Sequence, residues 1–126
     1  MMKIMEINLK LRYNLFSKKE VADLFRAIIQ DFIGYGKKQG FKPVFIIIPQ
    51  KDDVLFIKKH KNYYHDFLQS LKKDLLVIDL TDYLEKREDL DDLYSDDNKY
   101  GGHPSRKGNE FIAQVIKNVL SDHKYV

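Results

Sequence analysis

Two short, continuous runs of apolar residues constrain the fold of this chain more than any other feature. They occupy residues 44–48 and 75–80, the second interrupted only by Asp79, and turn-forming or charged residues flank both runs. Runs of this kind are typical of parallel strands that are covered on both faces. The intervening residues, from about 53 to 73, have helical character, with a break favoured near residues 62–65. The sequence therefore predicts a β-α-β unit with a right-handed crossover, and we expect the first run at the centre of the sheet.

Apolar and polar residues alternate over residues 4–13, near the N-terminus. The apolar positions are Ile7, Leu9, Leu11 and Tyr13. In a strand these side chains would share one face, and the polar side chains between them would share the other. We therefore expect residues 1–16 to form a half-buried strand at the edge of the sheet.

One amphipathic helix is predicted before the β-α-β unit and another after it. A capping box formed by Ser17 and Glu20 predicts the start of the first helix, and Gly40 its end. The expected apolar face of the first helix comprises Val21, Leu24, Phe25, Ile28, Phe32 and Tyr35. The second helix is predicted from about residue 105 to 122, with Phe111, Ile112, Val115, Ile116, Val119 and Leu120 as its docking face. Between residues 81 and 100 the chain is acidic, and we expect a short helix followed by a surface loop.

These elements predict one α/β domain over residues 1–126, with a short, mostly parallel sheet flanked by helices. The chain has no cysteine, which excludes disulfides, thiolate metal sites and thiol catalysis and agrees with a reducing compartment. It has neither an apolar run of membrane-spanning length nor the pattern of a signal peptide, so we expect a cytoplasmic protein that does not insert into membranes. The net charge of +3 comes from lysines scattered among acidic residues, so nucleic acid is not an expected partner.

The segment before the last predicted helix carries the clearest indication of chemistry. It reads Gly-Gly-His-Pro-Ser-Arg-Lys-Gly-Asn over residues 101–109, so the imidazole of His103 lies where a loop meets a helix N-terminus. A histidine in such a place suits general base catalysis. However, none of the five serines lies in a nucleophile motif such as Gly-Asp-Ser or Gly-x-Ser-x-Gly. An alternative is that His103 and Ser105 only cap the helix.

With the strand, helix, strand and acidic loop that precede it, this segment resembles the C-terminal half of the SGNH, or GDSL-type, family of esterases and acyltransferases. The resemblance covers residues 17–122. It implies a three-layer, flavodoxin-like fold of the SGNH type, in which His103 is the catalytic base. Ser105, Gly108 and Asn109 occupy the places that follow the histidine in the family.

The chain also departs from the family pattern in two respects. The family blocks that carry the nucleophilic serine and the oxyanion-hole glycine and asparagine have no counterpart here. The aspartate of the family usually precedes the histidine by three residues, where this chain has Tyr100. The resemblance therefore points to Asp97, or to Asp96, as the carboxylate that orients His103.

Other candidate sites are weaker. Gln50 follows the first predicted strand, and ligands bind beyond the carboxyl ends of parallel strands, so Gln50 is a candidate substrate-binding residue. The acidic loop lacks the ligand spacing of a calcium-binding EF-hand. His60 and His65 lie five residues apart, which does not place them on one helix face for zinc. We therefore predict neither a metal nor a cofactor.

These observations leave several functions open, including whether the chain is an enzyme at all. One is the C-terminal portion of an SGNH-like ester hydrolase or acyltransferase, truncated and inactive alone, whose nucleophile is encoded in an upstream half-domain. A related possibility is that another polypeptide supplies the nucleophile to His103. The alternative is a non-catalytic α/β module that assembles with itself, for example as a homodimer, or binds a partner through an exposed sheet edge or an apolar face.

Overall fold

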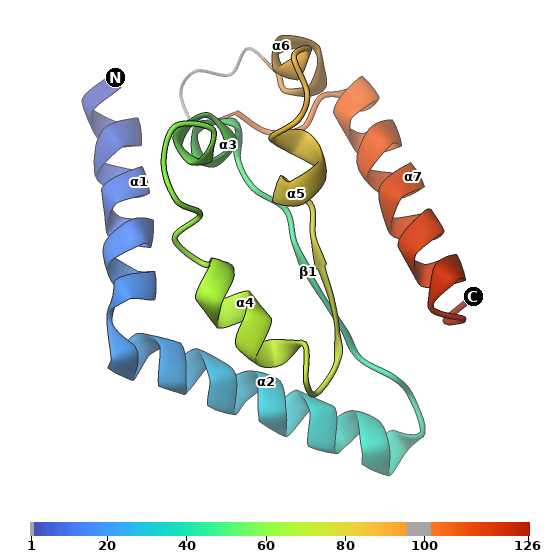
Figure 1. Cartoon of the computed structure of the whole chain (residues 1–126). Coiled ribbons are helices and arrows are strands. Elements are labelled where there is room, and N and C mark those ends of the chain that lie inside the picture. The colour runs from blue at the N-terminus through green and yellow to red at the C-terminus, as the bar shows by residue number, and fades with distance from the viewer. Residues whose placement is uncertain (1, 96–101) are drawn as a thin grey trace.

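A computed structural model of the chain describes residues 2–95 and 102–126. The elements in order are α1 (Met2–Ser17), α2 (Lys19–Gln39), β1 (Val44–Ile47), α3 (Lys51–Ile57), α4 (His65–Leu71), β2 (Leu76–Asp79), α5 (Thr81–Leu84), α6 (Leu90–Leu93) and α7 (Arg106–Asp122) (Figure 1). The predicted α/β fold is confirmed at this level. None of the helices in the described ranges combines the length and apolar character needed to cross a membrane.

The two predicted strands form one parallel pair. Val44 lies opposite Leu76, and Ile47 lies opposite Asp79. Helices α3 and α4 connect the strands, and the gap between the two helices confirms the predicted break near residues 62–65. Within the described residues no further strand pairs with β1, so the central position expected for β1 is not found. In the part of the chain that the structure describes, each strand therefore has one edge without a strand partner, which we call its free edge.

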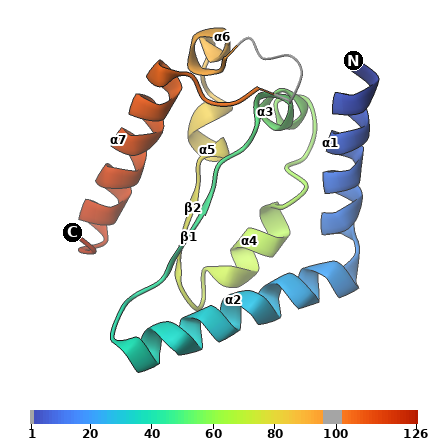
Figure 2. The ribbon, with the colours of Figure 1, turned by 180° about the vertical axis from the view of Figure 1, so that it is seen from behind.

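Side chains from the two faces of the sheet enter two separate cores. Val44 and Leu76 pack on the first core, and Phe45 and Val77 pack on the second, as the alternation of side chains in a strand requires. The first core is built around α7 and consists of Val54, Ile78, Leu80, Leu84, Leu90, Leu93, Tyr94, Ile112 and Val115. The second core, between the sheet and α2 and α4, consists of Ile29, Ile33, Ile57, Tyr64, Phe67, Leu68 and Leu71. Helix α7 accordingly lies across the strand pair from α1 and α4 (Figures 1 and 2).

The N-terminal segment is a helix, so the prediction of an edge strand over residues 1–16 is wrong. Helix α1 turns Leu9, Arg12 and Phe16 partly inward, at spacings of three and four, and leaves Ile7 and Leu11 more than half exposed. The alternating pattern was ambiguous because the same residues also repeat at helical spacing. Leucine, lysine, glutamate and arginine favour a helix where no neighbouring strand offers hydrogen bonds.

The start of α2 also differs from the prediction, whereas its end does not. Lys18 is the N-cap residue, and the Ser17 hydroxyl donates to the Tyr13 carbonyl within α1. The predicted capping box at Ser17 and Glu20 is therefore wrong, because α1 continues through Ser17. Gly40 ends α2 in the left-handed conformation, with φ of 79°, as expected for a C-terminal stop.

Helix α2 buries a narrower face than its pattern predicts. Ile29, Ile33 and Gly36 are buried, and Phe25 packs against the same core. Most of the predicted docking face points outward: Leu24 is 64% exposed, Ile28 57%, Phe32 52% and Tyr35 54%. The apolar side of α2 is therefore wider than the part of it that packs against other described residues. In contrast, α7 buries Ile112 and Val115 of its predicted face.

Candidate functional site

The carboxyl ends of both strands lie at one end of the molecule, together with α3, α5, α6 and the first turn of α7 (Figures 1 and 2). Open parallel sheets bind ligands at this end, outside the carboxyl ends of the strands. The chain reaches His103 there, just before α7 begins. His103 therefore lies at the end of the sheet where open parallel sheets bind ligands.

The backbone on both sides of His103 is tied to α6 and to the end of β1. Tyr94 and Pro104 form an antiparallel bridge, in which the Ser105 amide donates to the Leu93 carbonyl at 2.8 Å. The Ser95 amide donates to the His103 carbonyl, also at 2.8 Å. The buried Tyr94 hydroxyl donates to the Pro49 carbonyl, directly after β1, at 2.8 Å. These bonds fasten the loop to the end of the sheet, while the His103 side chain is exposed.

Two glycines of the motif are required by close packing. Gly102 has a φ of 80°, and a Cβ there would lie 2.9 Å from Cβ of Lys51, in the first turn of α3. A Cβ on Gly108 would lie 1.9 Å from the Leu93 carbonyl oxygen, so only glycine lets α7 approach α6 this closely. Both glycines therefore have structural explanations that do not involve catalysis.

Ser105 also has a structural role, as the N-cap of α7. Its Oγ accepts from the Gly108 amide at 3.1 Å and donates to the Asp92 carbonyl at 2.6 Å. The capping alternative is thus confirmed for Ser105. It does not extend to His103, which precedes the cap by two residues and whose ring makes no hydrogen bond to any other described residue. Among the described residues, neither packing nor capping accounts for the imidazole.

The described serines do not supply a nucleophile to His103. The hydroxyls of Ser17, Ser70, Ser95 and Ser105 each donate to a main-chain carbonyl. The fifth serine, Ser121, lies near the C-terminal end of α7, whereas His103 precedes the N-terminal end of that helix. Ser95 Oγ lies near His103, but its hydrogen bond of 3.1 Å is to the His103 carbonyl oxygen. Asp96 and Asp97, the predicted orienting carboxylates, lie outside the described residues. The described chain therefore presents a histidine at the expected place without a nucleophile beside it.

Gln50 lies where the sequence placed it, between the end of β1 and the start of α3. Its backbone amide donates to Oδ2 of Asp53 at 3.0 Å, and the residue is partly buried. This position is suitable for a residue that contacts a substrate at this end of the sheet. The contacts of Gln50 with the described residues do not indicate which substrate.

Sequence reasoning missed a charged cluster beside Gln50. Asp53 is only 5% exposed and accepts three hydrogen bonds, from Arg12 Nε at 3.0 Å, from the Tyr63 hydroxyl at 2.7 Å and from the Gln50 amide. Arg12 also contacts Asp52 at 2.9 Å. The adjacent carboxylates after Pro49 were visible in the sequence, but their partner on α1 was not, because contacts between residues 40 positions apart leave no local pattern.

The pKa shifts within this cluster favour a structural role for it. Burial raises the pKa of Asp52, while Arg12 partly offsets that rise. Burial alone would lower the pKa of Arg12, but the carboxylates of Asp53 and Asp52 raise it above its ordinary value. Burial and the charge of Asp53 together raise the pKa of Tyr63, which stays protonated and donates. The cluster therefore ties α1 to α3, with the Arg12 guanidinium shared between two carboxylates.

A second polar group lies at the end of β2. Asp79 is nearly buried and accepts from the Thr81 amide at 2.9 Å, and Asn62 Nδ2 approaches it at 3.4 Å. Burial raises the pKa of Asp79, and the hydrogen bonds from Thr81 partly offset this. The Tyr64 hydroxyl is bonded to the Thr81 hydroxyl. These polar groups provide hydrogen-bond partners for one another at the end of β2.

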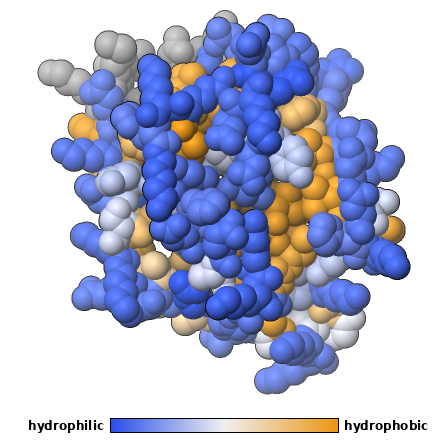
Figure 3. Space-filling view, viewed as in Figure 1, coloured by the Kyte–Doolittle hydropathy of each residue, from blue (hydrophilic) through white to orange (hydrophobic). Residues whose placement is uncertain are grey.

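A broad groove on the described part of the chain lies away from His103. Its volume is about 740 Å³, and it follows the free edge of β2 toward the C-terminal end of α7. Figure 3 shows apolar surface in this region, and the apolar lining residues include Leu76, Ile78 and Val119. Across the described part of the chain, no group of three or more histidine or acidic side chains is arranged to hold a metal ion.

We found no family model, no curated protein and no solved structure that matches this chain.

Proposed function

We propose that this chain is the histidine-bearing portion of an SGNH-like ester hydrolase or acyltransferase, with a three-layer fold that is completed by a polypeptide segment outside this chain. The observation that supports the proposal is the placement of His103. Its ring is exposed at the carboxyl ends of β1 and β2, while Gly102, Ser105 and Gly108 hold the backbone on both sides of it. A loop that needs only to cap a helix does not require an imidazole at this position.

In the proposed reaction His103 acts as general base and then as general acid. The imidazole takes the proton of a serine hydroxyl as its Oγ attacks the ester carbonyl, and it returns that proton to the departing alkoxide. A water molecule, or the hydroxyl of an acceptor, then releases the acyl group by the same two proton transfers. Asp97 is the proposed orienting carboxylate, on the basis of the sequence alone.

The nucleophile must come from a segment that this chain does not contain. The hydroxyls of Ser17, Ser70, Ser95 and Ser105 are engaged with main-chain carbonyls, and Ser121 lies at the end of α7 away from His103, so none of the five serines is activated by His103. We therefore expect the chain alone to hydrolyse p-nitrophenyl acetate no faster than the same concentration of free imidazole groups.

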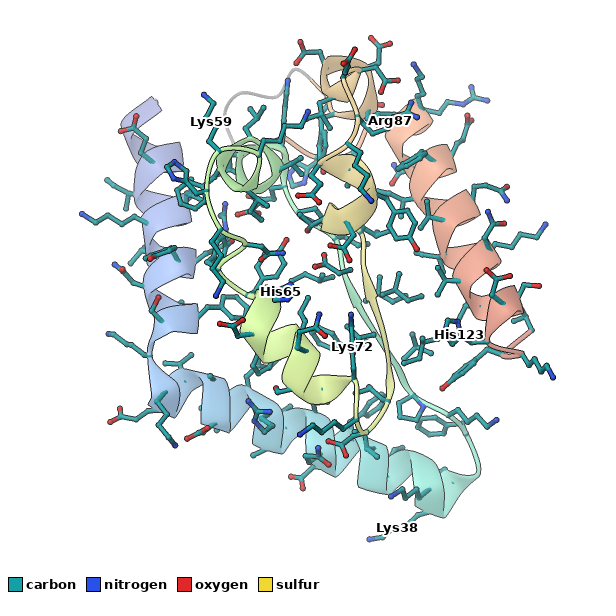
Figure 4. The ribbon with its side chains drawn as sticks, viewed as in Figure 1. Lys38, Lys59, His65, Lys72, Arg87 and His123 are labelled. Atoms are coloured by element: carbon teal, nitrogen blue, oxygen red, sulfur yellow. The ribbon has the colours of Figure 1, made fainter. Side chains whose placement is uncertain are left out.

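The proposal is tested by purifying the tagged chain after expression from its natural genomic context and treating the sample with a fluorophosphonate, which labels activated serines. The expected result is a labelled serine in a segment joined to or bound by this chain. Labelling should be lost in His103→Ala and retained in His123→Ala. His123 is a suitable control because it is also exposed but lies at the opposite end of α7 (Figure 4). Labelling that survives His103→Ala, or a purified sample with no reactive serine, would contradict the proposal.

Gln50 is tested in the same sample. If Gln50 contacts the ester, Gln50→Ala should raise KM for p-nitrophenyl acetate while kcat changes little, because its position next to Asp53 is fixed through its backbone amide. A loss of kcat without a change in KM would contradict a role of Gln50 in substrate binding.

A second candidate function is a non-catalytic module that assembles with itself. It is favoured by the free edge of β1 and by the outward apolar face of α2. Chains that carry such surfaces bind partners through them or aggregate.

A further inference from the structure

Helix α2 and the turn after it carry a continuous exposed apolar surface, which we call the outer stripe. It consists of Leu24, Ile28, Phe32, Tyr35 and Phe41, whose exposed fractions lie between 40% and 64%. The helical members are spaced by four, four and three residues, so they share one side of the helix. The Phe41 ring packs at 5.7 Å from Phe32 and at 5.8 Å from Tyr35, which joins the stripe to the segment that leads into β1.

The outer stripe lies on the same side of the molecule as the free edge of β1. The opposite flank of α2 faces β2, because Gln30 Nε2 donates at 2.6 Å to Asp74, two residues before β2 begins. Beyond the stripe, β1 contributes Ile46, which is 36% exposed, and the next turn contributes Ile48, at 51%. In the view from behind, α2 runs below β1 (Figure 2).

The surface is large enough for a stable contact. Leucine, isoleucine and aromatic side chains that are about half exposed each present on the order of 100 Å². The five residues of the outer stripe with Ile46 and Ile48 therefore offer roughly 600 Å² of apolar surface, the upper range for a monomer. With a polar rim this approaches the roughly 800 Å² that each partner contributes to a standard protein interface.

The charges at the two ends of the outer stripe are complementary in an antiparallel pairing, and the exposed Asp31 borders its middle beside Ile28 and Tyr35. Helix α2 has Glu20 in its first turn and Lys37 and Lys38 in its last turn. Lys38 extends away from the rest of the molecule (Figure 4). When two copies of α2 cross antiparallel about a two-fold axis level with residues 29–30, Glu20 of each copy comes within about one residue of the level of Lys38 of the other.

The apolar residues match in the same arrangement. Leu24 then lies opposite the partner's Tyr35, and Ile28 lies opposite the partner's Phe32. A surface that is complementary to itself under a two-fold rotation is what an isologous dimer requires. The antiparallel arrangement also places opposite helix ends together, which is electrostatically favourable.

We propose that this chain forms a two-fold dimer in which the outer stripes of two copies pack together with their α2 helices antiparallel. This interface is separate from the acyl-transfer proposal, because His103 directly precedes α7, whose first turn lies at the opposite end of the sheet from α2 (Figure 1).

The test is sedimentation velocity of the full chain from nanomolar to high micromolar concentration. The wild-type chain should sediment as a dimer at the upper end of the range. Ile28→Glu with Phe32→Glu should weaken dimerisation by more than about 100-fold, as expected for residues at the centre of an interface. The matched control is Leu55→Glu, which adds a charge to a side chain of α3 that is 45% exposed and outside the stripe, and it should leave the dimer intact. Circular dichroism of each variant separates loss of dimer from loss of fold.

A charge exchange tests the antiparallel arrangement itself. Glu20→Lys and Lys38→Glu should each weaken dimerisation by about 5-fold, as expected for exposed ion pairs that occur twice in a symmetric interface. The double variant should restore it, since each pair is then reversed. A wild-type chain that stays monomeric, or a dimer that survives the double glutamate variant, would overturn the proposal. Failure of the double charge variant to recover would overturn the arrangement. His103→Ala should leave sedimentation unchanged, so this test and the labelling test can fail separately.

Discussion

Helices α2 and α7 have similar apolar patterns but different surroundings. Helix α7 buries Ile112 and Val115, and its N-terminus is fitted closely to α6 through Gly108. Helix α2 buries Ile29 and Ile33 but leaves the outer stripe in solvent. An apolar pattern shows which residues of a helix favour burial. It does not show that the same chain provides the surface that buries them.

The largest expected difference in stability is between alanine substitutions of one glycine in α7 and one glycine in α2. In α7, Gly108→Ala should lower the free energy of unfolding by about 3 kcal/mol or more, because its Cβ would overlap the Leu93 carbonyl. In α2, Gly34→Ala should raise it by up to about 1 kcal/mol, because alanine favours a helix and no atom lies within 4 Å of the new Cβ. Urea unfolding followed by far-UV circular dichroism measures both. Equal effects would contradict the close contact of α7 with α6.

The next contrast lies between two neighbouring residues of α2. Ile29 is 6% exposed and Ile28 is 57% exposed. Ile29→Ala should destabilise the monomer by about 2–3 kcal/mol, because it leaves a cavity in the second core. Ile28→Ala should cost less than about 0.5 kcal/mol at concentrations below the dimerisation range. A larger loss for Ile28 in the monomer would mean that α2 is rotated about its axis relative to this structure.

A smaller effect is expected for the contact that holds α1. Arg12→Met removes the cation that faces Asp53 and Asp52 and should lower the free energy of unfolding by about 1–2 kcal/mol. This value is discounted from that of a fully buried pair because the Arg12 side chain is 28% exposed. Lys10→Met, an exposed change on the same helix, is the control. If both variants unfold alike, α1 is not fastened by Asp53.

The smallest effect concerns the polar contacts at the start of α7. The Arg87 guanidinium, with help from Lys107 of α7, lowers the pKa of Asp89 from 3.8 to about 2. Because the folded pKa is the lower one, this contribution to stability is present above pH 3.8 and is lost as the pH falls through about 2. An NMR titration of Asp89 measures the midpoint. Arg87→Met should raise it more than Lys107→Met does, and an unchanged midpoint in Arg87→Met would contradict the assignment.

Local sequence predicted those elements whose environment the chain itself supplies. The two apolar runs became β1 and β2, and the break near residues 62–65 separates α3 from α4. Gly40 ended α2 and Ser105 capped α7, since both signals act through the backbone within one turn. The N-terminal segment was predicted wrongly because its pattern fits a strand and a helix, and only the absence of a neighbouring strand favours the helix.

The candidate site divides in the same way. His103 and the residues around it were identifiable because they form one short segment at a loop-to-helix junction. The cluster of Arg12, Asp53 and Tyr63 was not, because its members lie on separate elements and meet only after folding. The charges of Arg12 and Asp53 attract each other, but the two residues are far apart in the sequence, so no local sequence pattern indicates the contact.

By itself, the sequence determined the strand pair, the final helix and the position of the imidazole, because each depends on side-chain periodicity or capping over a few neighbouring residues. Only the tertiary structure decided that the N-terminal segment is helical, which face of α2 is buried and which carboxylate holds Arg12. These outcomes depend on which surfaces of other elements are available for packing, and those surfaces come together only when the chain folds.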